Sequence, residues 1–241
     1  MSTIFETAYA GHPIRYELTY PAARYQFHPP LRPSGAAAPD ICLSSQLLAA
    51  GRALLPPDSS DGYVEFRCLI EPTARSLLRY GCTLFHAVAF VFRGRAILLT
   101  APSGVGKTTQ FLNWQRLYPG ETAVINGDKP LLESRSDGQI FVHTSPWCGK
   151  ERLSGNHVAP LGGVVLLARG DENCLVPLSA REAAAPLMMQ FLARPETEAE
   201  IRALTSILDR MMRACPVLQL TNRGDDASTE LLRDALNRRM K

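Results

Sequence analysis

The chain has 241 residues, 46% hydrophobic and 20% charged, so it is long enough to bury the core of one large domain or two small ones. Its formal net charge is only +3 and like charges form no long run, so no nucleic-acid partner is expected. The first residues lack the basic and apolar stretches of a secretory signal, and no apolar run approaches the roughly 20 residues that cross a bilayer. We therefore expect a cytoplasmic protein without a membrane partner.

Six cysteines are scattered along the chain without a CxxC pair. No histidine stands at metal-ligand spacing from them, so neither a zinc site nor a disulfide framework is predicted. They are typical of small buried residues in a reduced cytosolic protein.

The first third of the chain is interrupted by prolines and has strand-like patterns. Apolar and polar residues alternate over 12–20 and again over 63–69, and a helical pattern follows over 72–80. These features predict a small N-terminal β-rich module over residues 1–80, followed by a main domain over 81–241. The alternative is that the module simply extends the main sheet.

Strand signals become stronger after residue 84. Residues 85–92 and 95–100 are apolar or β-branched runs, and Arg93-Gly94 between them is a dipeptide typical of a hairpin turn. The glycine-rich run 101–108 comes next, followed by a helical pattern that ends before Pro119-Gly120. The order is thus strand, glycine-rich loop and helix.

The remainder of the chain alternates strand and helix patterns. Further strands are expected at 123–126, 131–132, 140–142, 162–168, 174–178 and 217–220, and helices from the capping box at Ser179, over 196–213 and over 227–239. The expected fold class is α/β with a mixed sheet.

The run 101–108 reads Ala-Pro-Ser-Gly-Val-Gly-Lys-Thr, the composition of a phosphate-binding loop. A glycine-rich turn between a buried strand and a helix lets backbone N–H groups and the positive helix end face an anion. Lys107 would reach the β- and γ-phosphates, and Thr108 would offer its hydroxyl to Mg²⁺. The residues predicted to hold the nucleotide are Ser103, Gly104, Val105, Gly106, Lys107, Thr108 and Thr109.

One residue departs from the pattern GxxxxGK[ST], because Ala101 stands where the first glycine is usual. Ala101 lies at the end of the expected strand, and the inner glycines Gly104 and Gly106 remain, so we expect a small effect. The alternative is a chance Gly-Lys-Thr loop, but the flanking strand and helix favour phosphate binding.

Two further runs accompany Phe85–Thr100 and the loop that follows it: Gly127-Asp128-Lys129-Pro130-Leu131-Leu132 and Ser145-Pro146-Trp147-Cys148-Gly149-Lys150. Together these segments resemble HPr kinase/phosphorylase, and more closely the bacterial HPr-kinase-like proteins of unassigned substrate. The similarity covers residues 84–170 well, the C-terminal part loosely and the N-terminal third in outline. It implies the P-loop nucleotide-binding fold that HPr kinase shares with phosphoenolpyruvate carboxykinase, with Mg²⁺ and ATP as cofactors.

The resemblance also implies transfer of the γ-phosphate to a hydroxyl, without identifying the acceptor. A serine of a peptide or protein and a small molecule both stay open. HPr itself is not expected, because the C-terminal substrate segments of HPr kinase have no convincing counterpart here. The base of the nucleotide and the oligomeric state, a homo-oligomer included, are left open as well.

Phosphoryl transfer needs a carboxylate beside the loop. Asp128 follows the expected strand 123–126 and is the best candidate, as a metal ligand with Thr108 and as a catalytic residue; its alternative role is a turn-forming aspartate. The related proteins carry two aspartates here, and in HPr kinase the first is the proposed base, where this chain has Gly127. Either Asp128 fulfils both roles, another acid such as Glu151 contributes, or activity is weak or lost.

Three other residues are catalytic candidates. Lys150 and Arg152 stand in a loop from which cations could reach the γ-phosphate, although a solvated basic loop has the same composition. The resemblance implies that His86 lies near the phosphates. The alternative is a core residue, which is the more common role of a histidine on an apolar strand.

The leading hypothesis is therefore an ATP-dependent kinase. The main alternative is a non-catalytic nucleotide-binding regulatory module. It stays open because Gly127 stands where the related proteins carry the first of two aspartates. A carboxykinase-like enzyme would need a carboxylate-substrate site and a second metal site that the sequence does not reveal.

Overall fold

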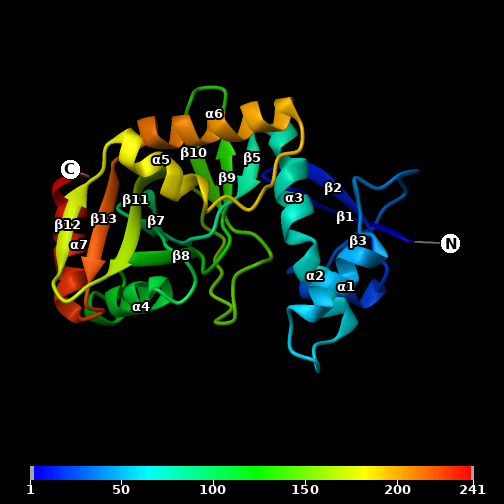
Figure 1. Ribbon diagram of the computed structural model, residues 1–241, viewed down its shortest axis with the longest axis horizontal. Coiled ribbons are helices and arrows are strands. Elements are labelled where there is room, and N and C mark those ends of the chain that lie inside the picture. The colour runs from blue at the N-terminus through cyan, green and yellow to red at the C-terminus, as the bar shows by residue number, and fades with distance from the viewer. Residues whose placement is uncertain (1–2, 240–241) are drawn as a thin grey trace.

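A computed structural model describes residues 3–239, which form two lobes of unequal size (Figure 1). The larger lobe is built on a nine-stranded sheet and the smaller one on a four-stranded sheet. The chain begins in the smaller lobe and ends in the larger. The predicted α/β class with a mixed sheet is confirmed.

The smaller lobe contains short strands paired in the order β3-β1-β2-β4 together with helices. Its elements are β1 (Ile4–Tyr9), β2 (His12–Glu17), β3 (Arg32–Pro33), β4 (Ile41–Cys42), α1 (Ser45–Ala53), α2 (Asp61–Cys68), α3 (Ile70–Ser76) and short 3-10 helices at Pro21–Gln26 and Leu77–Tyr80. The helix predicted over 72–80 is confirmed.

The strand predicted over 63–69 is wrong, because residues 63–68 belong to α2 and Leu69 is its C-cap. The Ser60 hydroxyl caps this helix by accepting the Tyr63 N–H at 3.3 Å. The buried Glu65 carboxylate accepts the N–H groups of Thr19 and Tyr20 at 2.7 and 2.8 Å. Capping and tertiary contacts thus override the local alternation. The lobe is accordingly mixed rather than β-rich.

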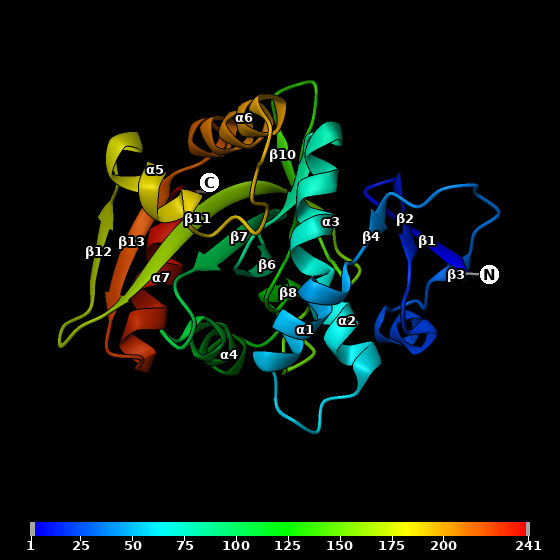
Figure 2. The same cartoon turned by 45° about the vertical axis from the view of Figure 1, so that its right-hand side comes forward.

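A continuous cluster of buried side chains contains Phe66 of the smaller lobe and Leu84 of the larger. In Figure 2, α3 stands between the small sheet and the main sheet, and it contacts β5 and β4. The division into two domains at residue 80 stays a prediction.

The main sheet has the order β5-β9-β10-β11-β7-β6-β8, and β13 pairs with both β11 and β12. Its strands are β5 (Cys82–Leu84), β6 (Val88–Phe92), β7 (Arg95–Thr100), β8 (Thr122–Asn126), β9 (Leu131–Ser134), β10 (Ile140–His143), β11 (Ala159–Arg169), β12 (Cys174–Pro177) and β13 (Val217–Asn222). All strands expected after residue 84 are present.

The directions of four strands determine at which edge of the main sheet the loops that follow them lie. β7, β11 and β13 are parallel, and β6 runs antiparallel to both β7 and β8. β8 therefore runs in the same direction as β7. Through their shared neighbour β6, Leu98 of β7 lies level with Asn126 of β8, because both pair with Ala89. The carboxyl ends of β7, β8, β11 and β13 thus meet at one edge, where α/β proteins commonly bind ligands.

The local predictions in this lobe are confirmed. Arg93 and Gly94 adopt φ angles of 49° and 73° in the β6–β7 turn, as a two-residue hairpin requires. The Ser179 capping box has both of its hydrogen bonds with Glu182. The helices are α4 (Lys107–Leu117), α5 (Ala180–Met188), α6 (Glu198–Ala214) and α7 (Asp226–Arg239).

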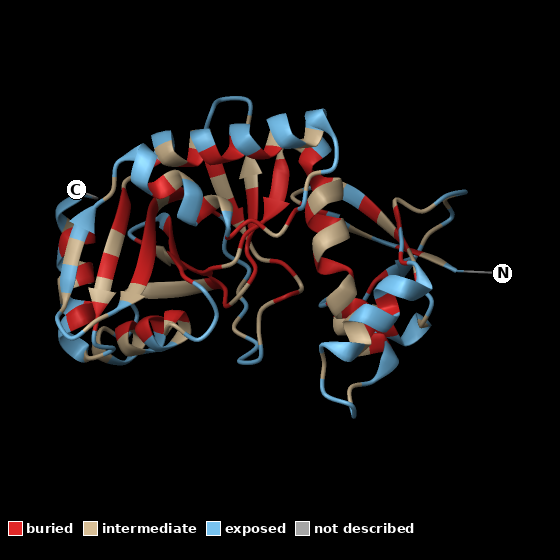
Figure 3. Ribbon diagram, in the orientation of Figure 1, coloured by how far each residue is buried: buried red, intermediate tan, exposed pale blue. Residues whose placement is uncertain are grey.

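Helices cover both faces of the main sheet (Figure 1). α4 contributes Phe111 and Trp114 to one buried cluster, and α7 adds Leu232. α6 contributes Leu208 and Met211 to the cluster on the other face. Figure 3 shows the main strands and the inward stripe of α6 as buried, with the outer face of α6 exposed. No helix within residues 3–239 is long and apolar enough to cross a bilayer.

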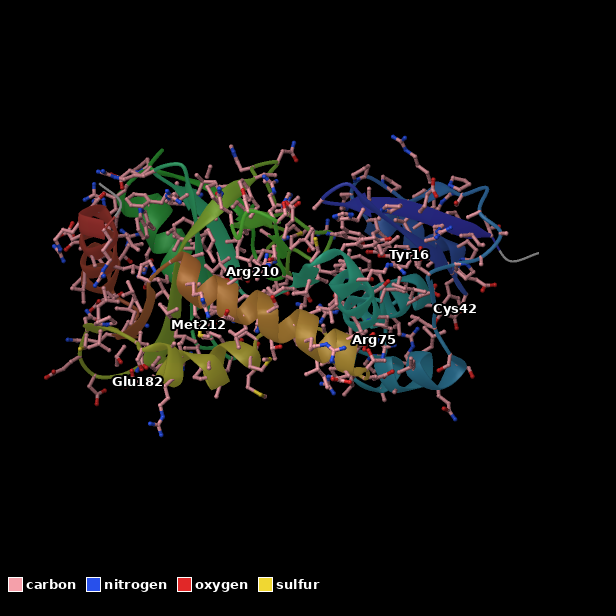
Figure 4. The ribbon with its side chains drawn as sticks, turned by 90° about the horizontal axis from the view of Figure 1, so that it is seen from above. Tyr16, Cys42, Arg75, Glu182, Arg210 and Met212 are labelled. Atoms are coloured by element: carbon pink, nitrogen blue, oxygen red, sulfur yellow. The ribbon has the colours of Figure 1, made fainter. Side chains whose placement is uncertain are left out.

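Seen from above, α6 runs from the smaller lobe across the larger one (Figure 4). Near its C-terminal end, Arg210 donates to the Arg135 carbonyl at 2.8 Å in the β9–β10 turn. Just before its N-terminus, Glu196 pairs with Arg75 of α3. The helix therefore joins the two lobes.

All six cysteines are free. Cys82 and Cys215 are buried, as expected, and burial raises the pKa of each thiol to about 12. The expectation of burial is wrong for Cys42 and Cys174, which are exposed.

Candidate phosphate-binding and transfer site

The glycine-rich loop connects β7 to α4 at the edge where the strand ends meet. Gly104 and Gly106 have φ angles of 82° and 118°, a region that residues with a Cβ rarely adopt. Gly106 is the residue directly before α4, so the loop ends at a helix N-terminus. Ala101 is fully buried, consistent with its expected place at the strand end. The two glycine conformations and the adjoining helix N-terminus are compatible with anion binding, and the assignment as a phosphate loop stays a prediction.

Lys107 begins α4, and only 8% of its surface is exposed. Its Nζ donates to the carbonyl oxygens of Ala101 at 2.9 Å and Pro102 at 3.3 Å, so the ammonium lies against the loop itself. Burial lowers the pKa of Lys107, while the negative charge of Asp128 opposes this shift. The lysine and the aspartate predicted for the site are therefore electrostatic neighbours.

The other residues predicted to hold the nucleotide differ in exposure. Ser103, Gly104 and Thr109 are exposed, whereas Val105, Gly106 and Thr108 are half-buried. Their assignment to a nucleotide stays a prediction.

Asp128 follows β8 at the same edge and pairs with two cationic or ionisable neighbours. Its Oδ1 lies 3.4 Å from His86 Nε2, and its Oδ2 accepts a hydrogen bond from Lys129 Nζ. Burial raises the pKa of Asp128, but the hydrogen bond from His86 and the charge of Lys129 outweigh this and lower it to about 2. Asp128 is consequently a carboxylate at neutral pH. His86, predicted near the phosphates, lies beside Asp128.

Asn126 shapes the turn that carries Asp128, and the sequence reasoning missed it. The side chain is fully buried, and its Oδ1 accepts the N–H groups of Asp128 at 2.9 Å and Lys129 at 2.7 Å. Its Nδ2 donates to the Ser145 carbonyl at 3.0 Å. An asparagine at a strand end, two residues before a candidate aspartate, is the signal that could have indicated this Asx turn.

Lys129 and Arg169 were also missed. Lys129 is 8% exposed, and its charge is matched by Asp128. A lysine in an otherwise apolar run directly after the candidate aspartate could have indicated it, since lysines are seldom buried without a partner. Arg169, at the end of β11, donates from Nη2 to the Gly104 carbonyl at 2.5 Å. No sequence signal joins residues so far apart.

The segment after β10 packs against Asp128 from the side of the smaller lobe. Trp147 Nε1 donates to the Phe66 carbonyl of α2 at 2.9 Å, and the two rings stack with centroids 5.5 Å apart. The Trp147 carbonyl accepts the Lys129 N–H at 3.1 Å. A Cβ on Gly149 would lie 3.1 Å from that of Asp128, so the backbone there approaches the carboxylate closely.

Lys150 and Arg152, the predicted cations of this segment, are exposed. Lys150 lies 3.8 Å from the carboxylate of Glu151. Both cations border the same cavity as Asp128, yet within residues 3–239 neither forms an ion pair with it. The structure thus brings Lys107, His86 and Asp128 together and leaves Lys150 and Arg152 at the rim.

Gly127 lies where its surroundings leave little room for a side chain. A Cβ there would lie 2.8 Å from the Cys148 carbonyl oxygen and 2.8 Å from Leu153 Cβ. Contacts this short require the backbone to move. Glycine is therefore fitted to this position, and an aspartate would not fit without a local rearrangement.

Replacing Gly127 by aspartate or alanine is expected to lower the free energy of unfolding by about 1–3 kcal/mol, the usual effect of overpacking. Thermal or urea denaturation measures it. Gly35→Ala is the matched control, because a Cβ at Gly35 meets no atom within 4 Å. A Gly127→Asp protein as stable as the wild type would contradict the packing described here.

Two cavities flank the loop and Asp128. One of about 600 Å³ is bordered by the start of α4 and by the ends of β11 and β13, with Val105, Gly106, Thr109, Arg169 and Arg223 among its lining residues. The other, of about 480 Å³, is bordered by Asp128, by the segment 144–156 and by α2. The loop thus borders one space of small-ligand size and Asp128 borders another.

Within residues 3–239, no group of three or more His, Cys, Asp or Glu side chains gathers as a metal site. Mg²⁺ bound with a nucleotide needs only one or two protein ligands, the rest being phosphate and water oxygens. The Asp128 carboxylate has lone pairs beyond those used by His86 and Lys129. The Thr108 hydroxyl on the first turn of α4 is a second oxygen donor of the kind that Mg²⁺ binds, and the assignment of both residues to the metal stays a prediction.

Comparison with known proteins gives distant similarity to solved structures alone. No protein-family model and no curated protein matches the sequence. Among solved structures, the HPr(Ser) kinase/phosphatase of Coxiella burnetii is similar over 54% of this chain and 92% of that chain, with 10% identity and a TM-score of 0.30. A similarity of this size carries no conclusion about activity.

Proposed function

We propose that this protein is an ATP-dependent kinase in which the loop 101–108 holds the triphosphate. One observation carries the proposal: the glycine-rich loop with its buried Lys107 follows β7 and the carboxylate of Asp128 follows β8, and these two strands flank β6 and end at the same edge of the sheet. Phosphoryl transfer is mostly positioning and charge neutralisation, and it needs these parts together. The motif resemblance to HPr kinase/phosphorylase agrees with this function.

In this proposal the N–H groups at the start of α4 and the Lys107 ammonium bind the β- and γ-phosphates. Thr108 and Asp128 hold Mg²⁺, which neutralises charge on the phosphates when bound. The nucleoside occupies the cavity bordered by Arg169 and Arg223, since that cavity adjoins the loop at Val105 and Gly106. The γ-phosphate then faces Asp128.

Asp128 is suited to orienting an acceptor hydroxyl more than to removing its proton. A general base works best with a pKa near the working pH, whereas the pKa of Asp128 is about 2. The transition state of phosphoryl transfer is loose, so a weak base suffices when the hydroxyl is well placed. His86 positions the carboxylate, and Lys150 and Arg152 lie where a cation could approach the transferred group.

The second candidate is a nucleotide-binding module without catalysis. It is favoured by the packing around Gly127, which leaves no room for a second carboxylate, and by the low pKa of Asp128. Both candidates require nucleotide binding. Formation of a phosphorylated product, detected by mass spectrometry, decides between them.

The metal requirement provides a test of the proposed site. Calorimetry should show ATP binding more tightly with Mg²⁺ than with EDTA, and Thr108→Val should reduce this difference by about tenfold, the equivalent of about 1.4 kcal/mol. Thr205→Val on the exposed face of α6 is the matched control and should bind as the wild type does. Equal wild-type affinity with and without Mg²⁺ would count against a metal-assisted site.

A further inference from the structure

The cavity of about 480 Å³ beside Asp128 has one wall in each lobe. The larger lobe contributes Asp128 and the segment 144–156, and the smaller lobe contributes α2 with Tyr63, Phe66 and Arg67. Its lining residues differ from those of the nucleoside cavity, so a molecule here would contact the carboxylate without occupying the place of the nucleoside. If the kinase function holds, this is the cavity in which an acceptor would lie beside Asp128.

The cavity walls are held in place by the contact between the lobes. Trp147 is 3% exposed and is anchored to α2 through its indole N–H and by stacking on Phe66. Phe27 also meets the Trp147 ring edge-on at 5.8 Å. Such aromatic contacts stabilise the packing beyond the burial of the rings. The wall is therefore preformed, and the smaller lobe is part of it.

Charge indicates what the cavity binds. Its lining carries the cations Arg67, Lys150 and Arg152, whereas Asp128 is its one carboxylate among the described residues. Asp128 is already matched by Lys129. Arg67 is half-buried, and within residues 3–239 no carboxylate pairs with it. A guanidinium in this state is suited to bidentate binding of a carboxylate or phosphate.

The volume of the cavity and the polarity of its lining further restrict the class of ligand that fits. The volume lies in the range of small-molecule sites. Thr144 and Asn156 supply hydrogen-bonding groups to the lining, and Tyr63 supplies an aromatic face. We propose that this cavity is the acceptor site and that it takes a small hydroxyl compound bearing one carboxylate or phosphate group, bound through Arg67. The acceptor role rests on the proposed function, whereas the anion site can be tested separately.

NMR titration of the isotope-labelled protein tests the proposal, because the chain has two tryptophans in different environments. Trp147 borders the cavity, whereas Trp114 is a residue of α4 and is fully buried in the cluster between that helix and the main sheet. The probes are D-glycerate and glycerol 3-phosphate, with glycerol as the neutral counterpart. Both anions should shift the Trp147 indole signal in a saturable way and leave the Trp114 signal unchanged. Glycerol should move neither, and the anion bound more tightly indicates whether a carboxylate or a phosphate is preferred.

Arg67→Gln should weaken this binding by about 10- to 100-fold, the range for a hydrogen bond to a charged group. Arg67→Lys should restore part of it, because lysine keeps the charge and loses the bidentate geometry. Arg32→Gln is the matched control on the exposed β3 of the same lobe and should bind as the wild type does. The spectra also report whether each variant is folded.

Equal shifts with glycerol and with the anions, shifts that survive in a folded Arg67→Gln protein, or no saturable shift at all would overturn the inference. Calorimetry with Mg-ATP separates this failure from that of the proposed function. ATP binding without anion binding would leave the kinase proposal standing and remove the anion site. Arg67-dependent anion binding in a protein that does not bind ATP would leave the anion site standing and remove the kinase proposal.

Discussion

Asp128→Asn is expected to reduce phosphoryl transfer by at least about 10²- to 10⁴-fold, the contribution of a positioned acid–base group alone, while part of the ATP binding remains. Asparagine keeps the shape of the side chain, but it loses the negative charge that would hold Mg²⁺ and that balances Lys129. Transfer is measured by mass spectrometry of the acceptor, and ATP binding by calorimetry.

The substitution also leaves the buried Lys129 ammonium without its carboxylate, so we expect lower stability as well. Thermal denaturation should therefore accompany the kinetics, which are measured well below the unfolding transition. Asp137→Asn in the exposed β9–β10 turn is the matched control and should change neither property. A folded Asp128→Asn protein with wild-type transfer would remove Asp128 from the reaction.

Lys107→Ala is expected to weaken ATP binding by about 10- to 100-fold, because a charge-assisted hydrogen bond to phosphate is lost at the start of α4. The fold should persist, since within residues 3–239 the hydrogen bonds of the removed ammonium go to the loop carbonyl oxygens of Ala101 and Pro102. Calorimetry with Mg-ATP measures the change.

Arg116→Ala is the matched control for charge on the same helix. Arg116 lies in the last turn of α4, more than half exposed and paired with Asp226. Its loss should leave ATP affinity unchanged. Unchanged affinity in a folded Lys107→Ala protein would instead show that the loop 101–108 does not hold the phosphates.

Much of the larger lobe could be predicted because its signals are local. The Arg93-Gly94 turn, the Ser179 capping box and the glycine-rich loop each depend on a few adjacent residues whose backbone preferences agree with the final fold. Lys107 and Asp128 could be proposed for the same reason, since the loop of Lys107 and the turn of Asp128 each follow a strand that the pattern indicated. Their closeness then came from the parallel directions of β7 and β8.

What the sequence could not supply depends on tertiary contacts. Residues 63–69 alternate like a strand, but the Ser60 cap and the buried bonds of Glu65 favour α2. The crowding at Gly127 comes from Cys148 and Leu153, which no local pattern connects to it. Likewise, the contact of Arg169 with Gly104 requires β11 to lie beside β7.

The central claim is that the loop 101–108 presents a nucleoside triphosphate to Asp128. A crystal structure with Mg²⁺ and a non-hydrolysable ATP analogue tests it most directly. We expect the β-phosphate against the N–H groups at the start of α4, the γ-phosphate between Lys107 and Asp128, and the nucleoside in the cavity bordered by Arg169. Phosphates bound away from the loop, or a γ-phosphate directed away from Asp128, would contradict the account.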